Sequence, residues 1–234
     1  MNNKSMEFLY NGVTRTIYYD NEHFSVTTDN LALANFIKIK NKDKLLVEFG
    51  SGLLTIPLLL STRTNIKMIG IEKDKQACLL SNMSVKSNNL EKNVKVINDD
   101  ILNIKNYFDI NSIDIIVCNP PYFLLNNESI LSNKDSLKMA RHEVSMTFDD
   151  VAFLAKVYLR DGGSLFIIQR ASRLFEIRDT LVKNNLAIKE IQFIYHDLNT
   201  KSKLVLIEAR KSGSEHDLKV LEPIILKEGD INEL

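Results

Sequence analysis

Residues 44–60 read KLLVEFGSGLLTIPLLL, and this stretch decides the class of fold. An apolar run ends in Gly50 and Gly52, and a helix-like run follows at once at 53–62. A strand, a glycine turn and a helix in this order are typical of the first unit of a doubly wound α/β sheet. In such a sheet a ligand occupies the crevice at the carboxyl end of the strand, where glycines let it approach the backbone.

Further apolar runs repeat this unit along the chain. Runs that are apolar without alternation are typical of strands covered on both faces, as in a mostly parallel sheet. We expect strands at 44–50, 66–72, 94–99, 114–119, 163–169, 188–195 and 203–210. Helix-like segments lie between them at 53–62, 75–89, 149–160 and 173–184. This βαβ rhythm predicts a Rossmann-like, doubly wound, seven-stranded α/β sheet.

Two smaller elements precede the sheet. Asn11-Gly12 stands between two β-prone runs, which is a strong signal for a hairpin. The segment TTDNLALANFI at 27–37 predicts a helix capped by Thr28 or Asp29. Its buried side would carry Leu31, Leu33, Ala34 and Ile37.

The chain is expected to form a single domain over residues 1–234. No Pro/Gly/Ser-rich linker or internal repeat divides it, and residues 1–43 form the hairpin and helix extension. The segment 123–146 interrupts the βαβ rhythm, because it is polar, rich in asparagine and longer than an ordinary loop. Its place after a strand end favours a substrate-side loop, and the alternative is a disordered insertion.

Composition points to an ordinary soluble protein. The 30 basic and 30 acidic side chains give a formal charge of zero, so a polyanionic partner must be met by a local patch. Two cysteines, Cys78 and Cys118, fit a reducing cytoplasm, and four scattered histidines predict no metal site. We find no apolar stretch of membrane-spanning length and expect a cytoplasmic monomer without a membrane partner.

Acidic residues end the first three strands of the sheet. Glu48 belongs to the first strand, Glu72 ends the second, and Asp99-Asp100 ends the third. An acid at the position of Glu72 accepts hydrogen bonds from ribose hydroxyls in nucleotide-binding sheets. Both a nicotinamide dinucleotide and S-adenosylmethionine fit this arrangement, but the dinucleotide fingerprint requires a glycine where Thr55 stands.

The fourth strand runs directly into Asn119-Pro120-Pro121-Tyr122. Neither proline can donate to a strand ladder, and each restricts the residue before it, so this stretch is stiff. The side-chain carbonyl of Asn119 and the backbone carbonyl of Pro120 could accept the two N–H bonds of a planar amine and stabilise the charge that develops during methyl transfer. Tyr122 offers an aromatic face for a base taken out of its stack. Cys118 is interpreted as a buried small residue rather than a nucleophile.

These motifs together resemble a known family. VEFGSG, GIEKD, NDDI and NPPY are similar to the class I S-adenosylmethionine-dependent amino-methyltransferases. TTDNLALANFI, ARHEVSMTFDDV, IIQRASRLFEI and LKVLEPIILKEGDINEL narrow the resemblance to the bacterial tRNA(Val) adenine-37 N6-methyltransferases. The resemblance implies an antiparallel last strand, S-adenosylmethionine as cofactor and tRNA as substrate.

Carried onto this chain, the resemblance assigns site residues. Asn119, Pro120, Pro121 and Tyr122 match the catalytic motif. The implied cofactor-binding residues are Thr28, Asp29, Glu48, Gly50, Gly52, Glu72, Lys73, Asp99, Asp100 and Asn119, with Asp100 matching the adenine-contacting position better than Asp99. Leu54 stands where the family usually has a third glycine, and this side chain is expected to shift the loop and weaken cofactor binding.

Basic residues after the long loop, at the end of the fifth strand and in the last hairpin turn are candidate tRNA contacts. They are Arg141, His142, Arg170, Arg173, Lys201 and Lys203. Two other classes stay open at this point: a glutamine N5-methyltransferase acting on protein, and a nucleotide-binding module without catalysis. The former would be expected to carry a separate helical domain before the first strand, whereas about 40 residues precede it here.

Overall fold

The computed structural model describes residues 4–20, 27–119, 147–195, 197, 199–214, 216 and 218–225. The predictions for Pro120, Pro121, Tyr122, Arg141, His142 and the loop at 123–146 lie outside these ranges.

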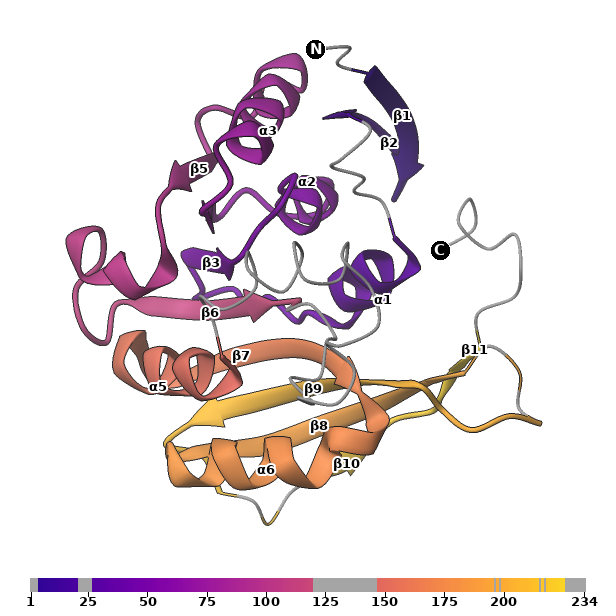
Figure 1. The fold of residues 1–234 in the computed structure, drawn as a ribbon, viewed down its shortest axis with the longest axis vertical. Coiled ribbons are helices and arrows are strands. Elements are labelled where there is room, and N and C mark those ends of the chain that lie inside the picture. The colour runs from indigo at the N-terminus through magenta and orange to yellow at the C-terminus, as the bar shows by residue number, and fades with distance from the viewer. Residues whose placement is uncertain are drawn as a thin grey trace, which may run out of the picture.

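A nine-stranded sheet forms the centre of the molecule (Figure 1). Its strands are β3 (Leu45–Phe49), β4 (Lys67–Glu72), β5 (Val94–Asn98), β6 (Ile113–Cys118), β7 (Leu159–Arg170), β8 (Leu186–Tyr195), β9 (Leu204–Lys211), β10 (Lys219–Val220) and β11 (Ile224–Ile225). Their order is β10-β8-β9-β7-β6-β3-β4-β5, with β11 also paired to β8. Every pairing is parallel except those of β9, which runs antiparallel to both β7 and β8.

The predicted Rossmann-like sheet is confirmed, since all seven expected strands are present. The last of these seven, β9, is antiparallel to its neighbours, as expected. The two-residue strands β10 and β11 are additions at the β8 edge, too short to show a hydrophobic period. β7 also begins earlier than predicted. Leu159 has extended backbone and pairs with Ile113, so the preceding helix ends at Tyr158 instead of Arg160.

Helices cover both faces of the sheet (Figure 1). The helices on one face are α1 (Thr28–Phe36), α2 (Thr55–Leu60) and α3 (Lys75–Ser87), and those on the other are the 3₁₀ helix η1 (Ile101–Asn106), α5 (Phe148–Tyr158) and α6 (Leu174–Lys183), which the 3₁₀ turn η2 (Ala171–Arg173) precedes. Among the helices in the described ranges, none has the length and apolar composition needed to cross a bilayer.

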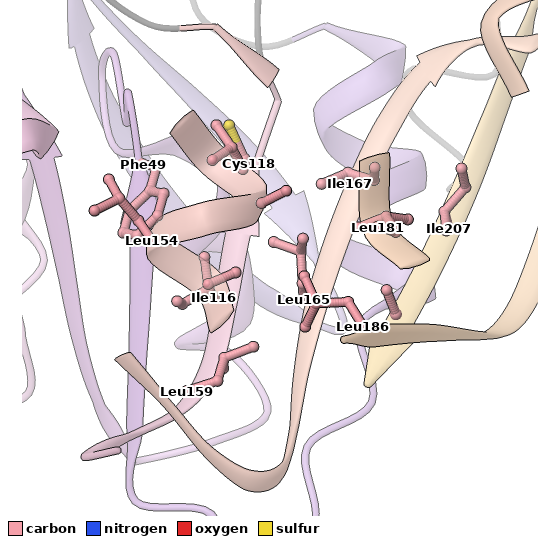
Figure 2. Packing of buried hydrophobic residues seen from close by; sticks show 14 of the residues in the cluster. Phe49, Ile116, Cys118, Leu154, Leu159, Leu165, Ile167, Leu181, Leu186 and Ile207 are labelled. Atoms are coloured by element: carbon pink, nitrogen blue, oxygen red, sulfur yellow. The ribbon is translucent and has the colours of Figure 1, made fainter. Parts of the chain in front are cut away.

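The sequence of β6 is apolar throughout because both of its faces are buried. Ile115 and Val117 join the cluster beneath α1 and α2. Ile116 and Cys118 join the cluster beneath α5 and α6, part of which is drawn in Figure 2. A residue that follows Cys118 by one position therefore returns to the face of α1 and α2, since successive side chains alternate.

The predicted N-terminal hairpin is confirmed as β1 (Lys4–Tyr10) and β2 (Val13–Tyr19). Asn11 and Gly12 both have positive φ, +50° and +73°, as the tight two-residue turn requires. The backbone of Thr16 exchanges two hydrogen bonds with the side chain of Asn88: its N–H donates to Oδ1 at 2.9 Å and its carbonyl accepts from Nδ2 at 2.7 Å. The hairpin is thus fixed to the end of α3 and stays separate from the central sheet.

The cap of helix α1 lies one residue before the predicted caps. Thr27, not Thr28 or Asp29, is extended and its side chain accepts a hydrogen bond from the Asn30 N–H at 3.3 Å. The predicted buried side is confirmed, because Leu31, Leu33, Ala34 and Ile37 are all buried. At the other end of α1 the ring of Phe36 meets Phe166 of β7 edge to face, with centroids 5.9 Å apart.

The Phe36–Phe166 contact predicts a measurable loss of stability. Phe36→Ala would leave a cavity between α1 and β7, and we expect it to lower the free energy of unfolding by about 3–5 kcal/mol. Urea unfolding measures this difference. Phe175→Ala on α6 is the matched control, since Phe175 is 82% exposed and its removal is expected to change stability by less than about 0.5 kcal/mol. Equal losses in the two variants would contradict the docking of α1 on β7.

Candidate active site at the carboxyl edge of the sheet

The strand register gathers predicted site residues at one edge of the sheet. Glu48 of β3 lies opposite Gly70 of β4 and Val117 of β6. Two residues further along the same three segments stand Gly50, Glu72 and Asn119. Because residues two apart share a face of a sheet, these positions form a second row on the face covered by α1 and α2. The glycine loop and the asparagine of the NPPY motif, predicted from separate parts of the sequence, therefore converge.

The loop between β3 and α2 has an unusual backbone. Gly50, Gly52 and Leu54 have φ values of +65°, +51° and +63°, so three alternate residues are left-handed. Among the described residues, no atom lies within 4 Å of the place where a Cβ of Gly52 would stand, so this part of the chain leaves the Gly52 backbone accessible to a ligand. Leu54 holds the left-handed conformation that the family's third glycine would adopt without strain.

Leu54 fits because Gly70 makes room for its side chain. Leu54 is fully buried, and a Cβ added to Gly70 would clash with the Leu54 Cδ1 and with the Ser51 side chain. The side chain therefore points down onto β4 and not up into the loop opening. This is the physical reason why Leu54 is compatible with the glycine turn, whereas the expected shift of the loop and the weaker cofactor binding stay predictions.

Glu48 is a carboxyl group placed inside the core. It is 3% exposed, and among the described residues no group hydrogen-bonds its Oε2. Burial raises the pKa of Glu48 well above its usual range, and the nearby charge of Glu72 adds to the rise. A buried polar atom without a partner is costly, so this oxygen is suited to receive a ligand that brings donors or positive charge.

Glu72 is fixed in position by backbone donors on both of its oxygens. Its Oε2 accepts from the Gly52 N–H at 2.7 Å, and its Oε1 accepts from the Asp74 N–H at 2.8 Å. Each carboxylate oxygen can accept a second hydrogen bond, so the pair can still bind a diol. The ribose acid predicted from sequence thus stands at the edge of the glycine loop.

The two aspartates after β5 have different surroundings. Asp99 accepts from the Tyr107 hydroxyl at 2.6 Å and from Asn103 Nδ2 at 2.8 Å, and these hydrogen bonds lower the pKa of its carboxyl. Asp100 caps η1, and its Oδ2 lies 3.2 Å from Lys73 Nζ, just beyond the end of β4. Both aspartates are thus engaged around η1, and the better match of Asp100 to the adenine-contacting position stays a prediction.

Asn119 is half-buried at the end of β6 and contacts α1. Its Nδ2 donates to the Oδ1 of Asn30 at 2.7 Å. Thr28 and Asp29, predicted to bind the cofactor, are the two residues before Asn30 in the first turn of the same helix. Asn30 was not singled out by sequence reasoning, because nothing in a single sequence shows that positions 89 residues apart meet.

The candidate tRNA contacts that lie in the described ranges differ in how well they could bind a phosphate group. Arg170 at the end of β7 and Lys203 just before β9 are both exposed. The chain brings them close together, because Arg170 pairs with Leu204 and the Ala171 N–H donates to the Lys203 carbonyl at 2.9 Å. Lys201 is also exposed. Arg173 instead pairs with Glu176, which raises the pKa of Arg173, so its guanidinium is already partly neutralised.

Neither metal binding nor cysteine chemistry is indicated in the described ranges. No group of three or more His, Cys, Asp or Glu side chains gathers there in a way that could hold a metal ion. Cys118 is fully buried, and burial raises the pKa of its thiol, which agrees with its interpretation as a small core residue.

Comparison with solved structures defines the class of fold. A predicted O-methyltransferase from Agrobacterium tumefaciens superposes with a TM-score of 0.67 at 17% identity, over 88% of this chain and 96% of that protein. A Thermus thermophilus 16S rRNA N2 G1207 methyltransferase, solved with AdoMet and guanosine, superposes with a TM-score of 0.63 at 15% identity, over 89% of this chain and 50% of that protein. The fold is that of the class I, Rossmann-like methyltransferases.

The particular family follows from the sequence comparison. The sequence model of the N-6 DNA methylase family matches residues 45–194, more than half of the chain, and the chain belongs to this family. A tRNA1(Val) (adenine(37)-N6)-methyltransferase of Cytophaga hutchinsonii is 22% identical over 217 residues, covering 92% of this chain and 88% of the relative. The enzyme of the same name from Shewanella halifaxensis is 25% identical over 191 residues, covering 75% and 76%. The resemblance read from the motifs is confirmed at the level of the family.

The left-handed Leu54 predicts an inverted order of stability among small substitutions. Leu54→Gly removes a buried side chain worth about 2–5 kcal/mol but relieves about 1–2 kcal/mol of left-handed strain, so it should destabilise by about 0–4 kcal/mol. Leu54→Ala loses nearly the same burial and keeps the strain, so it should be less stable than Leu54→Gly. Urea unfolding of the three proteins measures this order. An alanine variant more stable than the glycine variant would contradict a left-handed residue 54.

Glu48 predicts a pH dependence of folding stability. Its raised pKa means that the folded protein binds a proton more tightly than the unfolded chain, whose Glu pKa is about 4.3. The neutral Glu48 carboxyl therefore contributes its full stability below the pKa of the unfolded chain. This contribution is lost as the pH rises through the raised pKa of Glu48 in the folded protein. Glu48→Gln should flatten this decline. Urea unfolding of both proteins between pH 5 and pH 8, without cofactor, measures the slopes; parallel curves would contradict the burial of an ionisable Glu48.

Proposed function

We propose that this protein is an S-adenosylmethionine-dependent methyltransferase that modifies the N6 amine of adenine in tRNA, namely adenine 37 of tRNA(Val). The observation that carries the proposal is the row formed by Gly50, Glu72 and Asn119 at the carboxyl edge of the sheet. Asn119 directly follows β6, and Gly50 directly follows its parallel neighbour β3, which supports an amine acceptor site next to the glycine loop. The named substrates of the Cytophaga and Shewanella relatives support the choice of tRNA and of position 37.

The residues of the loop fit S-adenosylmethionine. No described residue covers the Cβ side of Gly52, and the buried Glu48 Oε2 has no described partner. Glu72 is suited to the ribose hydroxyls and Asp100, which pairs with Lys73, to the adenine amine. Gly50 and, in the first turn of α1, Thr28 and Asp29 are proposed to complete the cofactor site. When bound, this cofactor supplies an already activated methyl group.

The chain's own task is to hold the acceptor nitrogen. The Oδ1 of Asn119 and the backbone carbonyl of Pro120 accept the two N–H bonds of the adenine amine. Two acceptors favour a pyramidal nitrogen and stabilise the positive charge that develops there as the methyl carbon approaches. Tyr122 stacks on the base, and the nitrogen loses its proton to water after the transfer.

Arg170 and Lys203 are proposed to contact the tRNA backbone. Both side chains are exposed. Arg170 ends β7, which runs parallel to β6, and Lys203 precedes β9, which runs antiparallel to β7, so both lie at the same edge of the sheet as Asn119. Lys201, Arg141 and His142 complete the proposed contact surface, whereas Arg173 contributes less because of its pairing with Glu176. A protein with this substrate acts in the cytoplasm, and we propose that it works as a monomer formed by one domain.

The decisive experiment identifies the labelled nucleoside. The protein is incubated with methyl-labelled S-adenosylmethionine and total tRNA from a strain that lacks the enzyme, and the tRNA is then digested. Label in N6-methyladenosine at position 37 of tRNA(Val) is the expected result. Label at a glutamine of added bacterial protein, or in no substrate, would overturn the proposal.

Asn119→Ala predicts a separation of binding from turnover. Loss of one of two acceptors for the amine should lower kcat by about 10²–10³. The dissociation constant for S-adenosylmethionine, measured by calorimetry, should change little, because Glu48, Gly52 and Glu72 are untouched. Equal losses in cofactor affinity and turnover would contradict the role of Asn119 as a ligand of the amine.

A further inference from the structure

We infer that Asn30 is a positioning residue for the reaction, because its side chain fixes the direction in which the amide of Asn119 points. The inference rests on the proposed function and extends it to helix α1. The Nδ2 of Asn119 donates to the Oδ1 of Asn30 at 2.7 Å in a half-buried contact between residues 89 positions apart. This distance is that of a short, well-formed hydrogen bond.

The direction of the amide decides whether Asn119 can act. An asparagine side chain carries a donor group and an acceptor oxygen on opposite branches of one plane. Rotation by half a turn exchanges them and would present donors to an amine that is itself a donor. Because Asn30 accepts from Nδ2, the Oδ1 of Asn119 is turned to the other branch, as capture of an N–H bond requires.

Donation from Nδ2 also makes the oxygen a better acceptor. Hydrogen bonds at the two ends of one amide polarise each other, and the effect is larger where water is reduced. Asn30 therefore supports both the orientation and the basicity of the Asn119 carbonyl.

Asn30 can serve as a fixed reference because its own backbone is held. It is the third residue of α1, and its N–H donates to the Thr27 side chain that caps the helix. At the far end of the same helix Phe36 meets Phe166 of β7, which pairs with Val117 two residues before Asn119. The helix and the strand end are thus both bound to β7, which keeps the two asparagines in register.

Two substitutions at Asn30 distinguish a contact that orients the Asn119 amide from one that only stabilises the fold. Asn30→Leu preserves the size of the side chain and removes its acceptor, so kcat should fall by about tenfold to a hundredfold. In Asn30→Asp the ionised side chain can only accept hydrogen bonds, so it can pair with the Nδ2 of Asn119 and not with its Oδ1. Turnover should therefore stay near that of the unchanged protein at a pH where the new carboxyl group is ionised. Asn35→Leu is the control, since it removes the acceptor of the Tyr10 hydroxyl from the same helix without touching Asn119. Its turnover should be unchanged.

A second measurement does not depend on activity. The side-chain amide signals of Asn119, assigned in ¹⁵N spectra by their loss in Asn119→Ala, should show slow exchange with water in the unchanged protein and in Asn30→Asp. They should exchange fast in Asn30→Leu. Cofactor affinity and unfolding temperature, measured on all variants, identify any general damage to α1.

The outcomes are distinct from a failure of the proposed function. If the unchanged protein methylates no adenine, the function fails, whereas the amide exchange still reports the Asn30–Asn119 contact. The inference is overturned if Asn30→Asp is as slow as Asn30→Leu, if Asn30→Leu loses no more turnover than Asn35→Leu, or if the Asn119 amide exchanges equally in all variants.

Discussion

The geometry of the candidate site depends on the hydrogen bonds that the carboxylate of Asp114 accepts from the backbone. At the start of β6 its Oδ2 accepts the backbone N–H groups of Lys44 and Leu45 at 2.8 and 3.0 Å, which holds β6 against the start of β3. Arg160 of β7 binds both Asp114 and Asp43. These strands are apolar on both faces, so alternation alone does not fix their register. A slip of one residue would turn Asn119 toward α5 and Glu48 away from the glycine loop. The contacts of Asp114, Arg160 and Asp43 at the amino ends of the strands thereby fix the positions of Gly50, Glu72 and Asn119 at the carboxyl ends.

Much of this arrangement follows from the sequence for a simple reason. Carboxyl ends of parallel strands meet at one edge, so Glu48, Glu72 and Asn119 could be brought together from strand patterns alone. The Asn11-Gly12 hairpin was equally predictable, because few residues adopt two successive positive φ angles. The Asn30–Asn119 contact was not, since it depends on how α1 docks in three dimensions. The helix cap was misplaced by one residue because Thr27, Thr28 and Asp29 are all good capping residues, and only the backbone decides among them.

The site concentrates features that cost stability. Glu48 is a buried acid with an oxygen lacking a described partner, and Leu54 occupies a left-handed conformation. Both are tolerated because the surrounding core is continuous: Leu54 fills the space left by Gly70, and the cluster beneath α1 and α2 encloses it. A glycine at position 54 would relax the backbone but leave a void above β4. The departure from the family's third glycine is therefore one half of a compensated pair, and Gly70 is the other half.

Helix α1 also explains how a segment outside the βαβ units can belong to the site. In the proposed mechanism the amide of Asn119 needs a partner held by the folded core. Asn30 meets this need, because its helix is bound to β7 through Phe36 and Phe166, and β7 is the direct neighbour of β6. The N-terminal hairpin is fixed separately to α3 through Thr16 and Asn88. The same helix carries the candidate cofactor contacts Thr28 and Asp29 and, at Asn30, the acceptor of the Asn119 amide, so in the proposed site α1 would join the cofactor side to the amine side.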